Sequence, residues 1–230
     1  MDTAIRRPTS VILVLLSLLL TNTKGHADMP SPDYQPVLDF WFGPLHDGFP
    51  QEDRLGLWFR GKPDDDRDIN SRFGNLVHNA VYGELTGWES NPKSRLALII
   101  LLDQFTRSIY RKTAAAFSSD QRAQELARDT INKGWDKELA FTERQFLYMP
   151  LMHSEQLSDQ ELCIRAFKQL AEDVPEGRKE YINSSVHYAV EHRDLIARFG
   201  RFPHRNKALE RESTAEELEY LSSGASSYGQ

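Results

Sequence analysis

Cysteine is nearly absent from this chain, since Cys163 is the only one among 230 residues. A single cysteine cannot form an intrachain disulfide, and it excludes metal sites built from several thiolates. Cys163 lies in a predicted helix beside Leu162, Ala166 and Phe167, where a lone cysteine is usually part of the core. A chain without disulfides fits a reducing or an oxidising compartment equally well.

The chain also lacks the short motifs of several large enzyme classes. It has no Gly-x-Ser-x-Gly turn, no glycine-rich phosphate loop and no His-Glu-x-x-His pair. His153, Glu155, His192 and His204 provide nitrogen and oxygen donors, but they do not have the fixed spacing of metal ligands. We therefore predict no metal and no cofactor.

Excess positive charge is missing as well. The formal net charge is −6, from 28 Lys and Arg against 34 Asp and Glu. Broad nucleic-acid binding relies on a cationic surface that displaces counterions, so we predict no nucleic-acid partner. With 40% hydrophobic and 27% charged residues, the composition is typical of a soluble globular protein.

The apolar run near the N-terminus is short. Val11 to Leu20 follows Arg6-Arg7 and precedes Gly25-His-Ala27, which is the order of a secretory signal peptide. A run of this length spans about 15 Å as a helix, half of a bilayer core, so we expect no stable membrane span. We predict a signal peptide over residues 1–27 that is cleaved from a secreted or periplasmic protein. Alternatively, translation begins at Met29 and the protein is cytoplasmic.

Nearly everything beyond residue 33 is predicted to be helical. Apolar residues recur at three- and four-residue spacing, and no strand-like alternation lasts more than a few residues. We predict an all-α single domain of about eight antiparallel helices over 34–222, between a linker at 28–33 and a disordered tail at 223–230. The expected helices cover 34–42, 52–60, 64–83, 92–109, 120–134, 141–157, 158–174, 178–199 and a short last segment that begins near 213.

Three segments mix charged and apolar residues in a way that suggests a polar site. In the first, Leu96 to Leu102 is wholly apolar and predicts a central helix. Asp103, Gln104, Arg107 and Arg111 then share one side of it. Asp103 and Arg107 are expected to pair in a low-solvent setting, where an unpaired charge is costly. The pair either joins neighbouring helices or leaves an arginine free for a carboxylate or phosphate.

In the second segment, Pro150 interrupts an apolar helical stretch and predicts a kink three residues before His153. Glu155 follows His153, and Ser158-Asp-Gln-Glu161 predicts a capping box at the start of the next helix. A kink beside polar residues either shapes a pocket or results from helix packing alone.

The third segment runs from Ile196 to Asn206 and combines arginines with Phe199 and Phe202. Gly200 is placed as the residue that ends a helix, and His192 is expected to face the core. The polar side chains beyond Gly200 either cap helix ends and latch the fold or bind a ligand.

We predict that the three segments meet in one Arg- and His-lined pocket for a small anionic molecule or an acidic peptide end. The arginines would bind the anion, Gln104 and Asn206 would orient it, and Phe199 and Phe202 would form a wall. The predicted site consists of Gln104, Arg107, Arg111, His153, Glu155, His192, Arg201, His204, Arg205 and Asn206.

Two other functions are compatible with the same residues. One is a hydrolase or lyase in which His153 acts as general base, Glu155 orients it and the arginines stabilise developing negative charge. The other is a protein-interaction module, which predicts an exposed concave apolar patch away from the arginines.

Five motifs in order resemble a bacterial family, number 924 of the domain-of-unknown-function series. They are Val37-Leu-Asp-Phe-Trp-Phe42, Gly83-Glu-Leu85 with Trp88, and the segments 96–107, 146–155 and 198–206. The chain departs from the family pattern at Thr106, Ser108 and Glu210, where the family has Pro, Asn and Gly. The resemblance implies an all-α fold of the TPR-like helical superfamily, and it implies no activity.

Overall fold

The computed structural model describes residues 32–224. The predicted signal peptide at 1–27, most of the linker and residues 225–230 of the predicted tail lie outside the described residues. The described residues belong to a single unit of fold. Within them, no helix has the length and apolar character needed to cross a membrane.

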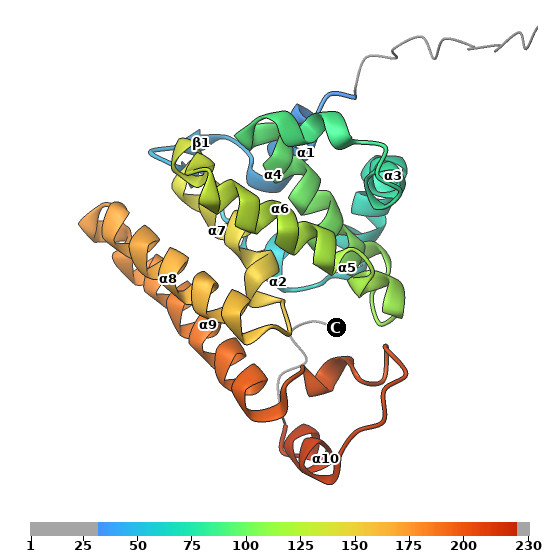
Figure 1. Ribbon diagram of the computed structural model, residues 1–230. Coiled ribbons are helices and arrows are strands. Elements are labelled where there is room, and N and C mark those ends of the chain that lie inside the picture. The colour runs from blue at the N-terminus through green and yellow to red at the C-terminus, as the bar shows by residue number, and fades with distance from the viewer. Residues whose placement is uncertain (1–31, 225–230) are drawn as a thin grey trace, which may run out of the picture. The chain divides into compact units, whose positions relative to one another are not determined.

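Helices make up almost all of the regular structure, so the all-α prediction is confirmed (Figure 1). The first half contains α1 (Gln35–Phe42), α2 (Leu55–Phe59), α3 (Pro63–Val81), α4 (Pro92–Ile99), a π-helical segment (Ile100–Phe105) and α5 (Thr106–Ile109). The second half contains α6 (Asp120–Asn132), α7 (Phe141–Met152), α8 (Leu157–Asp173), α9 (Lys179–Phe199) and α10 (Ala215–Ser222). Short 3-10 turns lie at Thr86–Ser90, Ala114–Phe117, Trp135–Glu138, Glu176–Arg178 and Pro203–Arg205.

One small hairpin interrupts the helices where a loop was predicted. β1 (Leu45–His46) pairs antiparallel with β2 (Phe49–Pro50), with Leu45 opposite Pro50. Gly48 has a φ of +82° in the connecting turn, a conformation that glycine adopts without steric cost. The chain therefore reverses within two residues and brings Phe49 back into the core.

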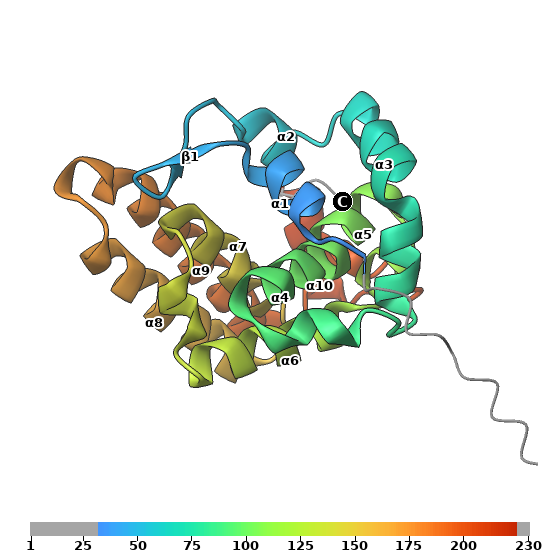
Figure 2. The ribbon, with the colours of Figure 1, turned by 90° about the horizontal axis from the view of Figure 1, so that it is seen from above.

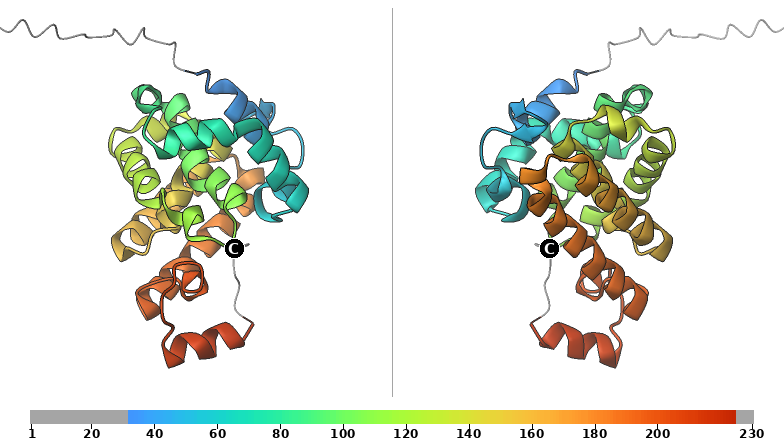
Figure 3. Two further views of the ribbon diagram at one scale, coloured as in Figure 1. Left: turned by 90° about the vertical axis from the view of Figure 1, so that its right-hand side faces the viewer. Right: turned by 90° about the vertical axis from the view of Figure 1, so that its left-hand side faces the viewer.

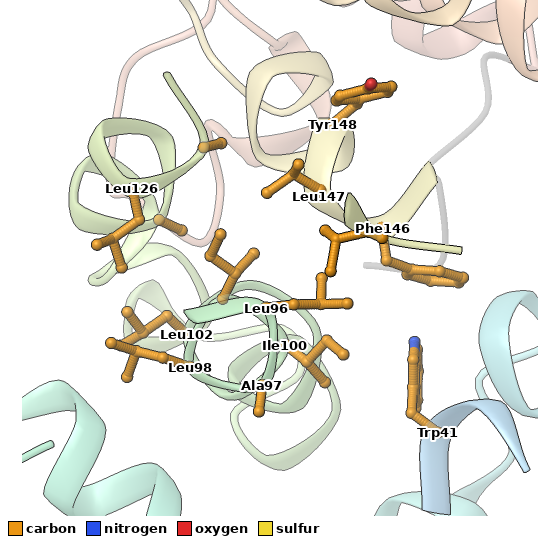
Figure 4. Packing of buried hydrophobic residues seen from close by; sticks show 14 of the residues in the cluster. Trp41, Leu96, Ala97, Leu98, Ile100, Leu102, Leu126, Phe146, Leu147 and Tyr148 are labelled. Carbon is orange, nitrogen blue, oxygen red and sulfur yellow. The ribbon is translucent and has the colours of Figure 1, made fainter. Parts of the chain in front are cut away.

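The central position of the helix that begins at Pro92 is confirmed. Every residue from Leu96 to Leu102 is at most 3% exposed. Helix α4 contacts α1, α6 and α7, and the π-helical segment that continues it contacts α3 (Figures 1 and 2). Figure 4 shows the side chains of Leu96, Ala97, Leu98, Ile100 and Leu102 leaving this helix in different directions, and Leu126 of α6 and Phe146 and Leu147 of α7 lie around it. A helix that is apolar all round can be buried on every side, which explains its place.

The central helix is not a regular α-helix throughout. The stretch Ile100–Phe105 has π-helical hydrogen bonding, and α-helical geometry returns at Thr106. Thr106 Oγ1 donates a hydrogen bond to the carbonyl of Leu102 at 2.7 Å. A π-helical turn is rare and changes the direction of the side chains that follow it.

Helix α7 contains Pro150 and ends soon after it. Proline has no N–H to donate to the carbonyl of Phe146, and α7 stops at Met152 with His153 as its C-cap. The prediction that this helix reaches residue 157 is wrong. The predicted capping box at Ser158 is not formed either, because α8 begins at Leu157, one residue earlier. Ser154 Oγ instead donates to the Asp159 carboxylate at 2.7 Å in the turn between the helices.

Helices α8 and α9 pack against each other, and both contact α7 (Figure 1). Gly200 ends α9 with a φ of +70°, as predicted. The C-terminal segment, residues 201–222, extends from this end of α9 (Figure 3). Phe202 of this segment packs with Leu195 and Ile196 of α9 in a small separate core, with Phe199 and Tyr220 against it.

Candidate functional site

A cavity of about 660 Å³ lies between α2, the π-helical segment with α5, α7 and α9. Its lining residues repeat at helical spacing on three of these elements. The central helix contributes Gln104, Arg107, Ser108 and Arg111; helix α7 contributes Gln145, Phe146, Met149, Met152 and His153; and helix α9 contributes Tyr181, Ser184, Ser185, Tyr188 and His192. Each helix therefore presents one continuous stripe to the cavity.

Aromatic side chains form one wall of the cavity. The Trp58 and Phe146 ring centroids are 4.8 Å apart, and those of Trp41 and Phe146 are 5.4 Å apart. The indole nitrogen of Trp41 points toward Phe146 and has no hydrogen-bond partner among residues 32–224 (Figure 4). Phe59 stacks on Phe146 from the outer side at 6.4 Å. Such a wall is suited to a flat or apolar ligand.

The exposure of the lining residues distinguishes two ends of the cavity. Leu55, Phe59 and Tyr188 are 42%, 58% and 54% exposed, and Arg60 is exposed as well. We call this end the mouth. The other end, which we call the floor, consists of Gln104, Arg107 and His153, whose side chains are nearly buried.

Asp103 holds His153 at the floor. Asp103 is fully buried, and its carboxylate oxygens lie 2.8 and 3.0 Å from His153 Nδ1. Arg107 Nη1 is 3.0 Å from Oδ1, and the amide of Gln104 donates to Oδ2 at 2.5 Å. Burial by itself raises the pKa of Asp103, but Arg107, His153 and Gln104 stabilise the carboxylate more strongly and lower it below its ordinary value. Asp103 is therefore ionised at neutral pH.

The pKa of His153 is lowered, chiefly because burial disfavours the imidazolium, although Asp103 opposes this effect. His153 is thus neutral near pH 7. An ionised carboxylate can only accept hydrogen bonds, so the hydrogen-bond network assigns the proton of His153 to Nδ1. Its Nε2 then carries the lone pair, and residues 32–224 give that atom no hydrogen-bond partner.

Arg107 is bound on two sides by carboxylates. It forms a two-pronged pair with Asp120, with both N–O distances at 2.9 Å, and it donates to the main-chain carbonyl of Asp103 at 2.8 Å. Asp120 also accepts from Arg205 at 3.4 Å. The predicted contact between Asp103 and Arg107 is present, and Asp120 is a second acid that pairs with Arg107. Two arginines, Arg107 and Arg205, and two carboxylates, Asp103 and Asp120, therefore lie together at and behind the floor, and their formal charges balance.

Arg111 lies near the mouth. It forms a two-pronged pair with Asp66, with two N–O distances of 2.8 Å. Its guanidinium also packs on the backbone of Gly61, where a Cβ would stand 3.0 Å from Nη1. The neighbouring Arg60 lines the cavity and makes no ion pair with any residue that the structure describes.

The ten residues predicted from the sequence fall into two groups. Gln104, Arg107, Arg111, His153 and His192 line the cavity. Glu155, Arg201, His204, Arg205 and Asn206 do not, and they lie instead in or beside the C-terminal segment. Phe199 and Phe202, expected as a wall of the site, pack in the small core of that segment.

Glu155 has a different partner from the one expected. Its carboxylate accepts from Arg211 at 2.7 and 3.0 Å and from the N–H of Phe202 at 2.8 Å. Asp103 takes the place at His153 that was predicted for Glu155. The reason is that α7 ends at His153, and the turn that follows directs Glu155 toward the C-terminal segment.

Glu217 is the centre of a hydrogen-bond network in the C-terminal segment. It accepts from Arg201 at 2.6 and 2.8 Å, from Asn206 at 3.1 Å and from the N–H of Thr214 at 2.7 Å. The hydrogen bonds from Arg201, and then those from Thr214 and Asn206, lower the pKa of Glu217 to about 2. Arg201 and Asn206 thus stabilise this segment.

The lowered pKa of Glu217 predicts how the segment depends on pH. The contact with Arg201 is at full strength above the ordinary pKa of 4.5, and it is lost as the pH falls toward about 2. At pH 7, Glu217→Gln should raise hydrogen-exchange rates in α10 about tenfold or more, because charge-assisted hydrogen bonds are lost. Glu216→Gln is the matched control, since Glu216 is exposed and pairs with Arg198 on the surface. Equal exchange in the two variants would contradict this role.

The other two histidines of the predicted site, His192 and His204, are held neutral by burial. Burial lowers the pKa of His192 to about 4 and that of His204 to about 3. His192 Nδ1 lies 2.7 Å from the carbonyl of Tyr188, one turn earlier on α9. Within residues 32–224, no three His, Cys, Asp or Glu side chains gather in a way that would hold a metal ion.

Several residues of the site were not predicted from the sequence. Arg60 was missed because nothing near it in the chain marks it as polar lining. The stripe on α9 had a readable signal, since Tyr181, Ser185, Tyr188 and His192 recur at helical spacing. Asp120 was expected only to begin a helix, and its two arginine partners come from distant parts of the chain.

The described residues thus define an all-α protein whose helices surround a cavity with an aromatic wall and a polar floor. The family model for a bacterial protein of unknown function, DUF924, matches residues 37–225, and the chain belongs to this family. A solved structure of a protein of unknown function from Agrobacterium tumefaciens is similar, with 35% sequence identity and a TM-score of 0.68. The match covers 83% of this chain and 97% of that chain. A comparison with curated proteins gives no match.

Proposed function

We propose that the protein binds a small organic anion in this cavity. The apolar body of the ligand packs on the aromatic wall, and its anionic group lies at the mouth beside Arg60 and Arg111. The observation that carries this proposal is the combination of an apolar wall with Arg60, a cationic side chain for which no described residue provides an acid. A cavity of about 660 Å³ has the size of a small-molecule site.

Charge favours the mouth over the floor as the place for the anion. At and just behind the floor, Arg107 and Arg205 are already balanced by Asp103 and Asp120. An additional anion there would meet two carboxylates in a low-dielectric setting. At the mouth, Asp66 pairs with Arg111, whereas Arg60 has no ion pair among the described residues. The acidic end of a peptide would meet the same groups, since its carboxylate has the same chemistry.

The interaction-module alternative has less support. Of the large apolar side chains that are exposed among residues 32–224, Leu55, Phe59 and Tyr188 line the cavity itself. The others, Val81, Tyr82, Leu157 and Leu218, lie on or next to α3, α8 and α10. Single exposed apolar residues are normal on a protein surface.

Thermal-shift measurements with hexanoate, octanoate, benzoate and phenylacetate test the proposal, with hexanol and benzamide as neutral counterparts. We expect the carboxylates to raise the melting temperature by about 2 °C or more at saturation, because a ligand that binds only the folded state stabilises it. Arg60→Ala should weaken carboxylate binding about five- to tenfold, the effect of one partly exposed ionic contact.

Arg165→Ala is the matched control for Arg60→Ala. Arg165 is also exposed and also lacks an ion pair among the described residues, but it does not line the cavity. If the neutral compounds bind as well as the carboxylates, the anionic part of the proposal is wrong. If no compound shifts the melting temperature, the cavity does not bind this class of ligand.

A further inference from the structure

The Asp103–His153 pair has the geometry of a positioned base. The carboxylate is fully buried behind the histidine, and both of its oxygens lie within 3.0 Å of Nδ1. This contact fixes the plane of the imidazole ring. It leaves Nε2 as the ring nitrogen without a hydrogen-bond partner among residues 32–224, on a side chain that lines the cavity. In catalytic triads, a buried acid orients the histidine base by the same kind of contact with Nδ1.

The backbone on both sides of this pair departs from regular helix. Asp103 lies inside the π-helical segment, and His153 follows Pro150 by three residues at the end of α7. A π-helical turn and a proline inside a helix each weaken the local hydrogen bonding. Both departures lie next to the same side-chain contact, and such features are frequent at functional sites.

Neutral hydroxyl groups complete the site. Ser185 Oγ accepts a hydrogen bond from the amide of Gln145 at 2.9 Å. Its own O–H therefore remains available to donate toward the cavity, where an oxygen that develops negative charge would accept it. Ser108 adds a second hydroxyl to the lining.

We propose that His153, oriented by Asp103, is the general base for hydrolysis of an ester or amide of an organic acid bound in the cavity. This inference rests on the proposed binding function. Nε2 takes a proton from a water molecule while the water oxygen attacks the carbonyl carbon. The bond to the leaving oxygen or nitrogen then breaks, and the proton on Nε2 passes to the leaving group. The products are a carboxylic acid and an alcohol or amine, and water is the only co-reactant.

Asp103 is a positioning residue in this scheme, and His153 is the catalytic residue. The lowered pKa of His153 keeps Nε2 unprotonated, so hydrolysis should persist below pH 6.5, where an ordinary histidine becomes charged. The anion at the mouth would hold one end of the substrate, and the scissile carbonyl would lie toward the floor.

Hydrolysis of mono-4-nitrophenyl adipate and 4-nitrophenyl hexanoate tests the proposal. We expect His153→Gln to lower kcat/KM by about 100-fold or more, the usual contribution of a general base. Hexanoate should still raise the melting temperature of this variant. His187→Gln is the matched control, because His187 is exposed on α9 outside the cavity lining. We also expect the adipate ester to be preferred to the hexanoate ester, and Arg60→Ala to remove that preference.

The outcomes separate the two proposals. If hexanoate binds but the wild-type protein hydrolyses both esters no faster than His153→Gln, the catalytic inference is wrong and the binding function stands. The hydrolysis can also depend on His153 while kcat/KM is the same for the adipate and hexanoate esters and is unchanged in Arg60→Ala. In that case the proposed mode of binding is wrong. If neither hydrolysis nor binding is observed, both are wrong.

The tautomer of His153 gives a test that needs no substrate. Nitrogen-15 NMR of the wild-type protein should show the Nδ1–H form, and Asp103→Asn should shift His153 toward the Nε2–H form with a loss of hydrolysis. A wild-type protein in the Nε2–H form overturns the proposal, even if Asp103→Asn does not fold.

Discussion

Arg107→Ala is expected to lower the free energy of unfolding by about 3–5 kcal/mol, the usual effect of breaking a buried ion pair from one side. The arginine contacts both Asp103 and Asp120, and its removal leaves Arg205 as the nearest cation at Asp120. Two buried carboxylates would then share one cation. Urea or guanidinium unfolding followed by circular dichroism measures this change, because the midpoint falls in proportion to the lost stability.

Arg122→Ala is the matched control for this prediction. Arg122 also pairs with acids, Glu89 and Glu125, but its side chain is 46% exposed. Surface pairs of this kind contribute about 0–1 kcal/mol. If the two variants lose the same stability, the network at the floor of the cavity does not stabilise the fold in the way described.

Phe146→Ala is the second change with a large expected effect, a loss of about 3–5 kcal/mol of stability. Phe146 is 2% exposed, and its ring meets Trp41, Phe42 and Trp58 in edge-on contacts at 4.8 to 5.5 Å. Truncation removes these contacts and leaves a void beside the cavity. The melting temperature should fall by roughly 6–20 °C for a domain of this size.

Phe59→Ala distinguishes core packing from cavity lining in this comparison. Phe59 also lines the cavity and stacks on Phe146, but it is 58% exposed. We expect it to cost about 1 kcal/mol or less, since little apolar surface is buried there. A similar loss in both variants would show that Phe146 is not the centre of the aromatic wall.

The sequence was sufficient to predict what depends on local patterns. Seven consecutive apolar residues from Leu96 placed the central helix, and Gly200 marked the end of α9. The spacing of Gln104, Arg107 and Arg111 correctly put them on one face. These features follow from helical periodicity and from the conformational freedom of glycine, which neighbouring residues alone determine.

Long-range pairings could not be predicted in the same way. Asp103 and His153 are 50 positions apart, and Glu155 and Arg211 are 56 apart, so no local spacing connects them. A π-helical turn has no clear sequence signature, yet it positions Asp103. Because α7 ends at Met152, Asp103 and not Glu155 contacts His153. The sequence prediction extended this helix to residue 157, and that error at one helix boundary led to the choice of Glu155.

Other expectations from the sequence stay predictions. The signal peptide falls on residues that the structure does not describe. The all-α fold and the family are shown, whereas the TPR-like arrangement is not tested by the similarity to a solved structure. Secretion and a cytoplasmic location remain the two alternatives stated at the outset.

The aromatic wall gives the cavity an optical reporter of its own. Of the four tryptophans in the chain, Trp41 and Trp58 line the cavity, whereas Trp88 and Trp135 lie outside its lining. Indole fluorescence responds to the polarity of its surroundings. Ligand binding in the cavity should therefore change the emission of Trp41 and Trp58 and leave that of Trp88 and Trp135 as an internal reference. Occupancy is thus readable without any label attached to the chain.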